Sequence, residues 1–126
     1  RTLQPMGALR AAEKLQALAT GGTGDLVVAA GGKSTVFVWR GSEPSCTSWS
    51  AGESFIQWLT ISPDDRVLVS SACGDLRAWR LLDGQPLARW KGCGNNARLR
   101  FSPDGALLAE VGEQLRVWTV PVDWTR

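Results

Sequence analysis

The segment of this chain closest to a chemical motif is GGKST at residues 31–35, which ends like a phosphate-binding loop. That loop begins with a glycine five residues before its final glycine, and Val27 stands at this position. The loop also needs a following helix, whose N-terminal amides complete the phosphate cradle. Residues 36–39 read Val-Phe-Val-Trp instead, which is typical of a strand. We therefore interpret the segment as a hairpin turn.

Metal and nucleophile chemistry also lack their usual residues. The chain contains no histidine, and its three cysteines, Cys46, Cys73 and Cys93, form no CxxC pair. This excludes the common zinc-ligand sets and any Ser-His-Asp or Cys-His arrangement within the chain. An odd number of widely spaced cysteines suits a reducing compartment. We predict a non-catalytic intracellular protein, cytoplasmic or nuclear, without catalytic residues, cofactor or metal.

Two adjacent carboxylates, Asp64 and Asp65, are the only side chains that suggest an acid–base pair. Adjacent turn residues point apart and face solvent, and aspartate favours turns because its carboxylate binds turn amides. Asp64 and its counterpart Asp104, which both follow a Ser-Pro dipeptide, are therefore predicted to be structural.

The overall composition points to a globular chain with many turns. Hydrophobic residues make up 44% and charged residues 21%, and 14 residues are glycine. No apolar run approaches the roughly 20 residues that a membrane helix needs, so we predict no membrane partner. The net charge is +2, with basic and acidic residues interspersed, and this gives no electrostatic support for nucleic-acid binding.

The elements that would position these residues repeat along the chain. Trp39, Trp79 and Trp118 each end a short strand-like run, and they recur about every 40 residues. A Ser-Pro-Asp turn precedes the last two, at residues 62–64 and 102–104. A turn followed by a Trp-ended strand at a fixed period indicates an internal repeat.

Residues 62–92 and 101–120 resemble blades of the WD-repeat β-propeller family, and the resemblance extends over about residues 15–126. It implies an all-β fold, a partial β-propeller of about three four-stranded antiparallel blades. Propellers close with about four to eight blades, so we expect one propeller domain that continues outside this chain. The expected parts are a tail of a preceding blade or a lead-in segment at residues 1–14, and blades at residues 15–53, 54–94 and 95–126, the last of them complete or incomplete.

The repeat register assigns strands more closely. Residues 26–30 and 106–109 are continuous apolar runs, expected as inner strands buried on both faces. Residues 97–101 alternate apolar and basic residues, expected as a half-buried outer strand with its arginines outward. Residues 8–19 are strong helix formers, but the register favours a strand near residues 15–20, with a helix as the alternative.

Several family features are absent from these repeats. The family's Asp after the tryptophan is replaced, and the missing histidines remove its Asp-His hydrogen-bond network. The resemblance therefore implies that stability depends on apolar packing between blades, with Trp39, Trp79 and Trp118 as structural residues. Arg40, Arg80 and Thr119 stand where the family has Asp.

Antiparallel strands send alternate turns to opposite rims of such a fold. In WD-repeat proteins the rim around the central channel often binds partners, and Arg40 and Arg80 are expected there. Trp58 and Trp124 have no position in the repeat register, which makes each a candidate interaction anchor. The turns expected on this rim are residues 22–25, 40–44, 62–66, 80–85, 102–105 and 121–123.

The resemblance implies a protein–protein interaction scaffold, as part of a larger protein or of a multi-subunit assembly. Its expected partners are other proteins, including remaining propeller blades from the same or another chain. Two alternatives stay open: a nucleic-acid-binding propeller subunit, or a regulatory propeller attached to an enzyme domain outside this chain. Arg98 and Arg100 lie on one strand face and could contact phosphate, but a solvated strand edge explains them equally well.

Overall fold

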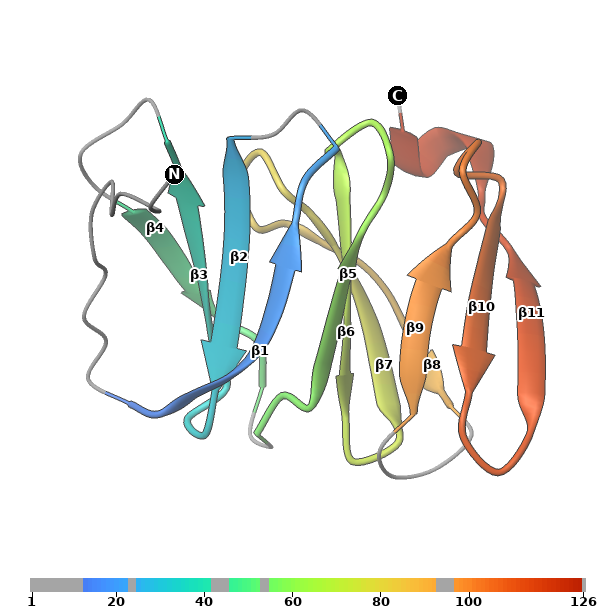
Figure 1. Ribbon diagram of the computed structural model, residues 1–126, viewed down its shortest axis with the longest axis horizontal. Coiled ribbons are helices and arrows are strands. Elements are labelled where there is room, and N and C mark those ends of the chain that lie inside the picture. The colour runs from blue at the N-terminus through green and yellow to red at the C-terminus, as the bar shows by residue number, and fades with distance from the viewer. Residues whose placement is uncertain (1–12, 23–24, 42–45, 53–54, 93–96, 126) are drawn as a thin grey trace, which may run out of the picture.

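The chain folds into three antiparallel β-sheets (Figure 1). The computed structural model describes residues 13–22, 25–41, 46–52, 55–92 and 97–125. These residues include eleven strands and no α-helix, so the predicted all-β class is confirmed. Sheet 1 contains β1 (Leu15–Thr20), β2 (Leu26–Gly31), β3 (Thr35–Arg40) and β4 (Cys46–Ser50). Sheet 2 contains β5 (Trp58–Ile61), β6 (Val67–Ala72), β7 (Asp75–Arg80) and β8 (Pro86–Lys91). Sheet 3 contains β9 (Arg98–Phe101), β10 (Leu107–Val111) and β11 (Leu115–Thr119), and the 3-10 helix η1 (Val122–Thr125) follows it.

The helix-or-strand ambiguity near the start of the chain resolves as a strand for residues 15–20. β1 pairs with β2 in antiparallel register, with Leu18 opposite Ala29. Its side chains alternate, so that Ala17 is buried while Leu18 is 65% exposed. Pairing with a neighbouring strand therefore overrides the helix propensity of these residues. The remainder of that helix-prone segment, and most of the expected lead-in at residues 1–14, lie outside the described residues.

Each sheet is a meander whose strands follow one another in chain order. The first strands of the three sheets lie side by side, β1 beside β5 and β5 beside β9 (Figure 1). Residues 97–101 were expected as an outer strand, and β9 is an edge strand of sheet 3, at the edge that lies beside β5. The alternating pattern correctly predicts a half-buried strand. It reports which face of the strand is buried, and it carries no information about which sheet edge the strand occupies.

Two apolar cores hold the sheets together. Sheets 1 and 2 enclose the first, which includes Val28 and Val38 on one side and Leu68 and Trp79 on the other. Sheets 2 and 3 enclose the second, in which residues of β6 and β7 pack against Leu99, Phe101 and Leu108. Sheet 2 is consequently buried on both faces, and sheets 1 and 3 are each packed on one face by these cores.

In sheets 2 and 3, the tryptophan near the end of the third strand faces the preceding sheet. Trp79 is 5% exposed in the core with sheet 1, and its Nε1 donates to Ser70 Oγ at 3.1 Å. Trp118 packs toward sheet 2, and its Nε1 donates to Glu110 Oε1 at 3.4 Å. Trp39 is half-buried, and strand alternation places it on the face of sheet 1 opposite Val38.

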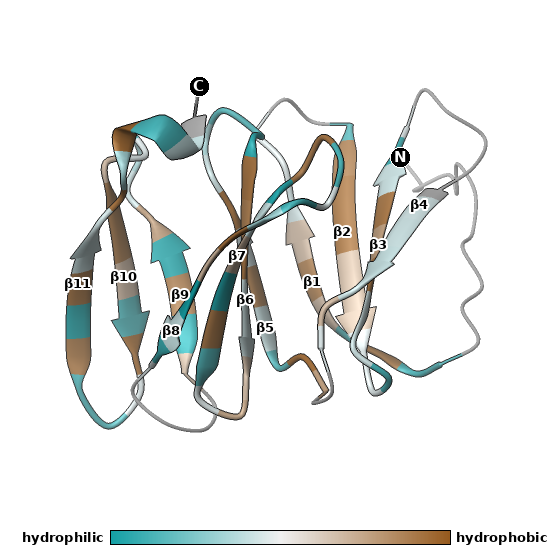
Figure 2. Cartoon of the chain, turned by 180° about the vertical axis from the view of Figure 1, so that it is seen from behind, coloured by the Kyte–Doolittle hydropathy of each residue, from teal (hydrophilic) through white to brown (hydrophobic). Residues whose placement is uncertain are grey.

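The outward face of sheet 3 carries exposed apolar side chains. Residues 106–109 were expected to be buried on both faces, but only Leu108 is buried and Leu107 is 42% exposed. The expectation fails because none of the described residues packs a further sheet on this face. On β11, apolar residues stand on either side of a hydrophilic one (Figure 2). The exposed apolar residues of this face are Leu107, Val111, Leu115 and Val117.

The two Ser-Pro-Asp turns have the same hydrogen bonds. In the first, Ser62 Oγ donates to Asp64 Oδ1 at 2.6 Å, and the Arg66 amide donates to the same carboxylate at 3.2 Å. In the second, the Ser102 hydroxyl and the Ala106 amide donate to Asp104 Oδ1 at 2.7 and 3.0 Å. These donors, the hydroxyl first, hold the pKa of Asp104 below its ordinary value. Both aspartates thus close the turns in which they lie.

Asp65 differs from the expectation that adjacent turn carboxylates face solvent. Its Oδ1 accepts a hydrogen bond from the Gly22 amide at 2.7 Å. This bond joins the β5–β6 turn to the segment that follows β1, two parts of the chain from different sheets. Asp65 has a φ of 62°, and Gly105 has a φ of 76° at the same point of the second turn. Asparagine, aspartate and glycine tolerate this left-handed conformation better than other residues do.

Candidate partner-binding surface

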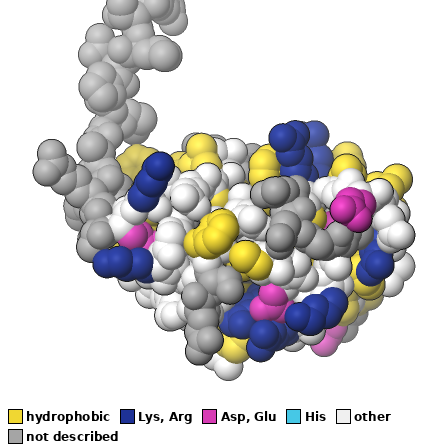
Figure 3. Space-filling view, turned by 90° about the horizontal axis from the view of Figure 1, so that it is seen from below, with side chains coloured by type: hydrophobic (Ala, Val, Ile, Leu, Met, Phe, Trp, Pro, Cys, Tyr) yellow, Lys and Arg dark blue, Asp and Glu magenta, His cyan; other side chains and the backbone are white. Residues whose placement is uncertain are grey.

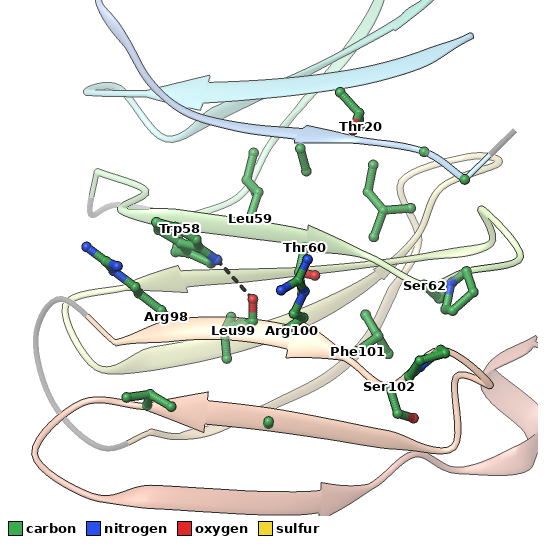
Figure 4. A pocket seen from close by; sticks show the side chains of 18 residues that line it. Thr20, Trp58, Leu59, Thr60, Ser62, Arg98, Leu99, Arg100, Phe101 and Ser102 are labelled. Atoms are coloured by element: carbon green, nitrogen blue, oxygen red, sulfur yellow. Dashed lines mark hydrogen bonds between the residues drawn. The ribbon is translucent and has the colours of Figure 1, made fainter. Parts of the chain in front are cut away.

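The described residues form a groove of about 1010 Å³ between the shared edges of the three sheets (Figure 4). We call it the edge groove. β5 lies in its middle, with the end of β1 on one side and β9 on the other. Its lining includes Thr20, Trp58, Thr60, Arg98, Arg100 and Phe101. No lining residue is acidic.

Trp58 contacts both Leu99 and Arg98 of β9 in the edge groove. The Trp58 Nε1 donates to the Leu99 carbonyl oxygen at 3.0 Å, which joins β5 to β9 (Figure 4). The Arg98 guanidinium carbon lies 5.4 Å from the centre of the Trp58 ring, a cation–π distance. Trp58 remains 37% exposed. It therefore connects two sheets and still offers surface to a ligand, and its role as an interaction anchor stays a prediction.

The β1–β2, β5–β6 and β9–β10 turns lie at the same end of the molecule (Figure 1), where they form a rim. The edge groove opens onto this rim. Gly22, Pro63 and Pro103 of these turns belong to its lining. The bond between Gly22 and Asp65 fixes two of the turns to each other. A partner that sits on this rim would therefore reach the groove directly.

Arg80 and Arg40 do not line the edge groove. Arg80 is exposed, and its Nε and Nη2 donate to the two carboxylate oxygens of Asp83 at 2.9 and 2.6 Å. Hydrogen bonds from Arg80 and from the Gln85 amide hold the pKa of Asp83 below its ordinary value. Arg80 thus stabilises its own β7–β8 hairpin. Arg40 is half-buried at the end of β3, opposite Leu26 of β2.

Trp124 lies in a cluster of aromatic rings at the outer part of sheets 2 and 3. Its ring centre is 6.0 Å from that of Trp90, and Trp90 lies 6.2 Å from Trp118. Trp124 is half-buried. Trp124 therefore packs against the second core, and it does not line the edge groove that contains Trp58.

The sequence placed Arg98 and Arg100 on one strand face but did not connect them with Trp58, and the structure brings all three to the same groove. The alternation along β9 was visible, but the partner strand β5 was not. Trp58 and Arg98 are the first residues of equivalent strands, β5 in sheet 2 and β9 in sheet 3. This 40-residue spacing between Trp58 and Arg98 was the sequence signal that could have connected them.

A second charged cluster lies near the opposite rim, where basic and acidic side chains stand beside one another (Figure 3). Arg77 Nε lies 3.3 Å from Asp75 Oδ2, and Arg89 Nε lies 3.1 Å from Asp75 Oδ1. Arg77 Nη1 also donates to the Ala51 carbonyl at 2.9 Å, which links sheet 2 to the segment after β4. Burial raises the pKa of Asp75, but Arg89 and then Arg77 lower it more, so its net pKa is depressed.

Replacing Asp75 with asparagine should remove a pH-dependent part of the stability. A carboxylate with a depressed folded pKa stabilises the protein above its unfolded pKa of about 3.9, and this stabilisation is lost as the pH falls through the folded pKa. Urea unfolding at neutral and acidic pH should show that Asp75→Asn lowers the midpoint at neutral pH and flattens its fall in acid. Glu113→Gln removes an exposed carboxylate from the β10–β11 turn. It should leave unchanged both the urea midpoint at neutral pH and the fall of this midpoint in acid. An unaltered pH profile in Asp75→Asn would contradict this role.

No protein-family model matches the chain, and no curated protein sequence matches it significantly. Within the described residues, no group of three or more His, Cys, Asp or Glu side chains could hold a metal ion. The same part of the chain contains no helix long and apolar enough to cross a membrane.

Proposed function

We propose that the chain forms three blades of a WD-repeat-like β-propeller that serves as a non-catalytic scaffold for protein–protein interaction. The supporting observation is the repeated use of equivalent positions in the three sheets. Val36 and Val38 in β3, and Leu76 and Ala78 in β7, are buried against the following sheet. Their equivalents in β11, Leu115 and Val117, are 67% and 57% exposed.

The opposite face of sheet 1 shows the complementary pattern. Trp79 and Trp118 face the preceding sheets, and Trp39 holds the equivalent place on the face of sheet 1 that no other described sheet covers. Leu18 on that face is 65% exposed. Sheet 3, at one end of the stack, therefore exposes the face that sheets 1 and 2 each pack against the following sheet. Sheet 1, at the other end, exposes the face that sheets 2 and 3 each pack against the preceding sheet. Further blades, from the same or another chain, would satisfy both faces and close a ring.

The shared strand edges also fit a propeller, because inner strands of neighbouring blades lie around one axis. In this arrangement β1, β5 and β9 are inner strands, the edge groove is part of the central channel, and the rim with the Ser-Pro-Asp turns surrounds its mouth. A rigid disc with a grooved centre and polar turns supplies a binding surface without bond-making chemistry. This arrangement supports the proposed scaffold function, and we expect partners on this rim.

The rim proposal is tested by charge reversal of Arg40 and Arg80. The double variant Arg40→Glu with Arg80→Glu should weaken a rim-bound partner, because charges near an interface steer association and specificity. Its effect on folding should be small, about 0.5 kcal/mol per surface site, with a further small loss from the exposed Arg80–Asp83 pair. The measurement is quantitative pull-down from the native source, paired with urea unfolding.

A matched control is Arg116→Glu, an exposed arginine of β11 that lies away from these turns. The control should retain the full partner set. If the double variant keeps the same partners, this rim is not the binding surface, and the opposite rim around Lys91 becomes the candidate. Turnover of a small substrate by the purified protein would contradict the scaffold function itself.

A further inference from the structure

The edge groove holds two arginines that no described carboxylate pairs with. Among the described residues, the ion pairs involve Arg77, Arg80 and Arg89, and each pairs with an aspartate of its own sheet. Arg98 and Arg100 are exposed, line the groove, and have no acidic residue beside them in that lining. The groove is therefore a local region of positive charge in a chain whose net charge is only +2.

The spacing of these arginines matches an extended peptide. Arg98 and Arg100 are alternate residues of β9, so both side chains leave the same face of the strand. Alternate residues of an extended strand are about 6.6 Å apart, twice the rise per residue. An extended peptide with carboxylates at alternate positions repeats the same distance. Guanidinium groups bind carboxylates through paired hydrogen bonds, which favours arginine at such a site.

The groove is also partly ordered before any ligand binds. Arg98 is held over the Trp58 ring, and the Trp58 Nε1 is bonded to the Leu99 carbonyl of the neighbouring strand. An arginine already held in place loses less conformational freedom on binding. Thr20 lies on the β1 side of the groove, across from Arg100 of β9, where its exposed hydroxyl can donate to a peptide carbonyl (Figure 4).

We propose that the edge groove binds an extended acidic peptide segment of a partner protein, with carboxylates of alternate residues on Arg98 and Arg100. This inference rests on the proposed function, because it names the class of partner that the scaffold takes at the channel. An acidic peptide fits better than nucleic acid for two reasons. Only two cations line the groove, whereas nucleic acid is held by many phosphate contacts. Arg98 lies over the Trp58 ring, which leaves less of the ring free for base stacking.

The experiment measures fluorescence anisotropy of a labelled peptide, Gly-Glu-Thr-Glu-Thr-Glu-Gly, with the purified protein in the oligomeric state in which it is isolated. The peptide with glutamine in place of each glutamate is the neutral control. We expect saturable binding of the acidic peptide and none of the neutral peptide. The affinity should fall when the salt concentration is raised from about 0.05 M to about 0.5 M, because salt shortens the Debye length and screens the charges. Arg100→Gln should raise the Kd about tenfold, the effect of losing one hydrogen-bonded charge.

Arg116→Gln is the matched control, since it removes one exposed arginine from the same sheet and should change the Kd by less than about twofold. Arg100→Lys keeps the charge and loses the paired hydrogen bonds, so its Kd should lie between those of the native protein and Arg100→Gln. Far-UV circular dichroism establishes that each variant is folded. If Arg100→Gln does not fold, the lysine variant and the salt dependence decide the question.

Three outcomes would overturn the proposal: equal binding of the glutamine peptide, an equal loss of affinity in Arg100→Gln and Arg116→Gln, or tighter binding of a labelled oligothymidylate than of the peptide. The last result would assign the groove to nucleic acid. These outcomes leave the scaffold function standing as long as the Arg40 and Arg80 double variant still loses a partner. If the acidic peptide does not bind but the Arg40 and Arg80 double variant still loses a partner, only the proposed ligand of the edge groove is rejected.

Discussion

Truncation of Trp79 to alanine should lower the free energy of unfolding by about 3–5 kcal/mol, the range found for large buried aromatic side chains. The ring is 5% exposed and lies in the core between sheets 1 and 2, with the Trp49 ring centre 6.2 Å away. The substitution also removes the donor to Ser70 Oγ, and Ser70 is itself buried. A cavity and a lost buried hydrogen bond therefore act together.

Urea unfolding followed by far-UV circular dichroism measures this loss. Leu82→Ala is the matched control, because Leu82 lies near Trp79 in the chain but is 84% exposed, and its truncation should cost less than about 0.5 kcal/mol. Trp79→Phe keeps most of the apolar volume and loses the hydrogen bond, so it should fall between the two. If Trp79→Ala and Leu82→Ala unfold at the same urea concentration, the assignment of Trp79 to the inter-sheet core is wrong.

The positions of the strands were predictable because local signals set them. The Ser-Pro-Asp turns bind their own amides through Asp64 and Asp104, and these bonds depend only on neighbouring residues. The expected strand near residues 15–20 coincides with β1, and that at residues 26–30 differs from β2 by one residue. Side-chain alternation then predicted which residues of β9 are buried, as Leu99 and Phe101 are.

The sheet edge at which each strand lies was not predictable from alternation. β9 pairs with β10 on one side only, and its other side faces β5 through the bond from Trp58 to a backbone carbonyl. A backbone acceptor leaves no mark in the sequence, because every residue carries one. The edge groove was missed for this reason: Trp58, Arg98 and Arg100 meet only when strands from two repeats lie side by side.

The apolar sequence of β10 led to a prediction of too much burial. The continuous apolar run at residues 106–109 predicts burial on both faces, and the chain buries only one of them. In sheet 2 the equivalent residues, Val67 and Val69, are fully buried because sheet 3 covers them. The sequence thus reported the environment expected in a continued stack of sheets, which supports the proposal that further blades pack here.

The isolated 126-residue chain should self-associate through these uncovered faces. Leu115 and Val117 project from the outward face of sheet 3, and burying an apolar side chain of this size is worth about 1.5–3 kcal/mol. Placing lysine at both positions removes that gain and adds charge to an apolar interface. We expect Leu115→Lys with Val117→Lys to weaken association at least about 100-fold, as the loss of two such side chains implies.

Size-exclusion chromatography with light scattering gives the test, since the native chain should elute above its monomer mass of 13.6 kDa and the double variant close to it. Leu82→Lys is the control, because it adds charge at an exposed apolar residue of the β7–β8 turn and leaves both stacking faces intact. It should associate as the native chain does. A native chain that runs as a soluble monomer and unfolds cooperatively would contradict the open stack, because repeat folds that expose an uncapped apolar face do not remain monomeric and soluble.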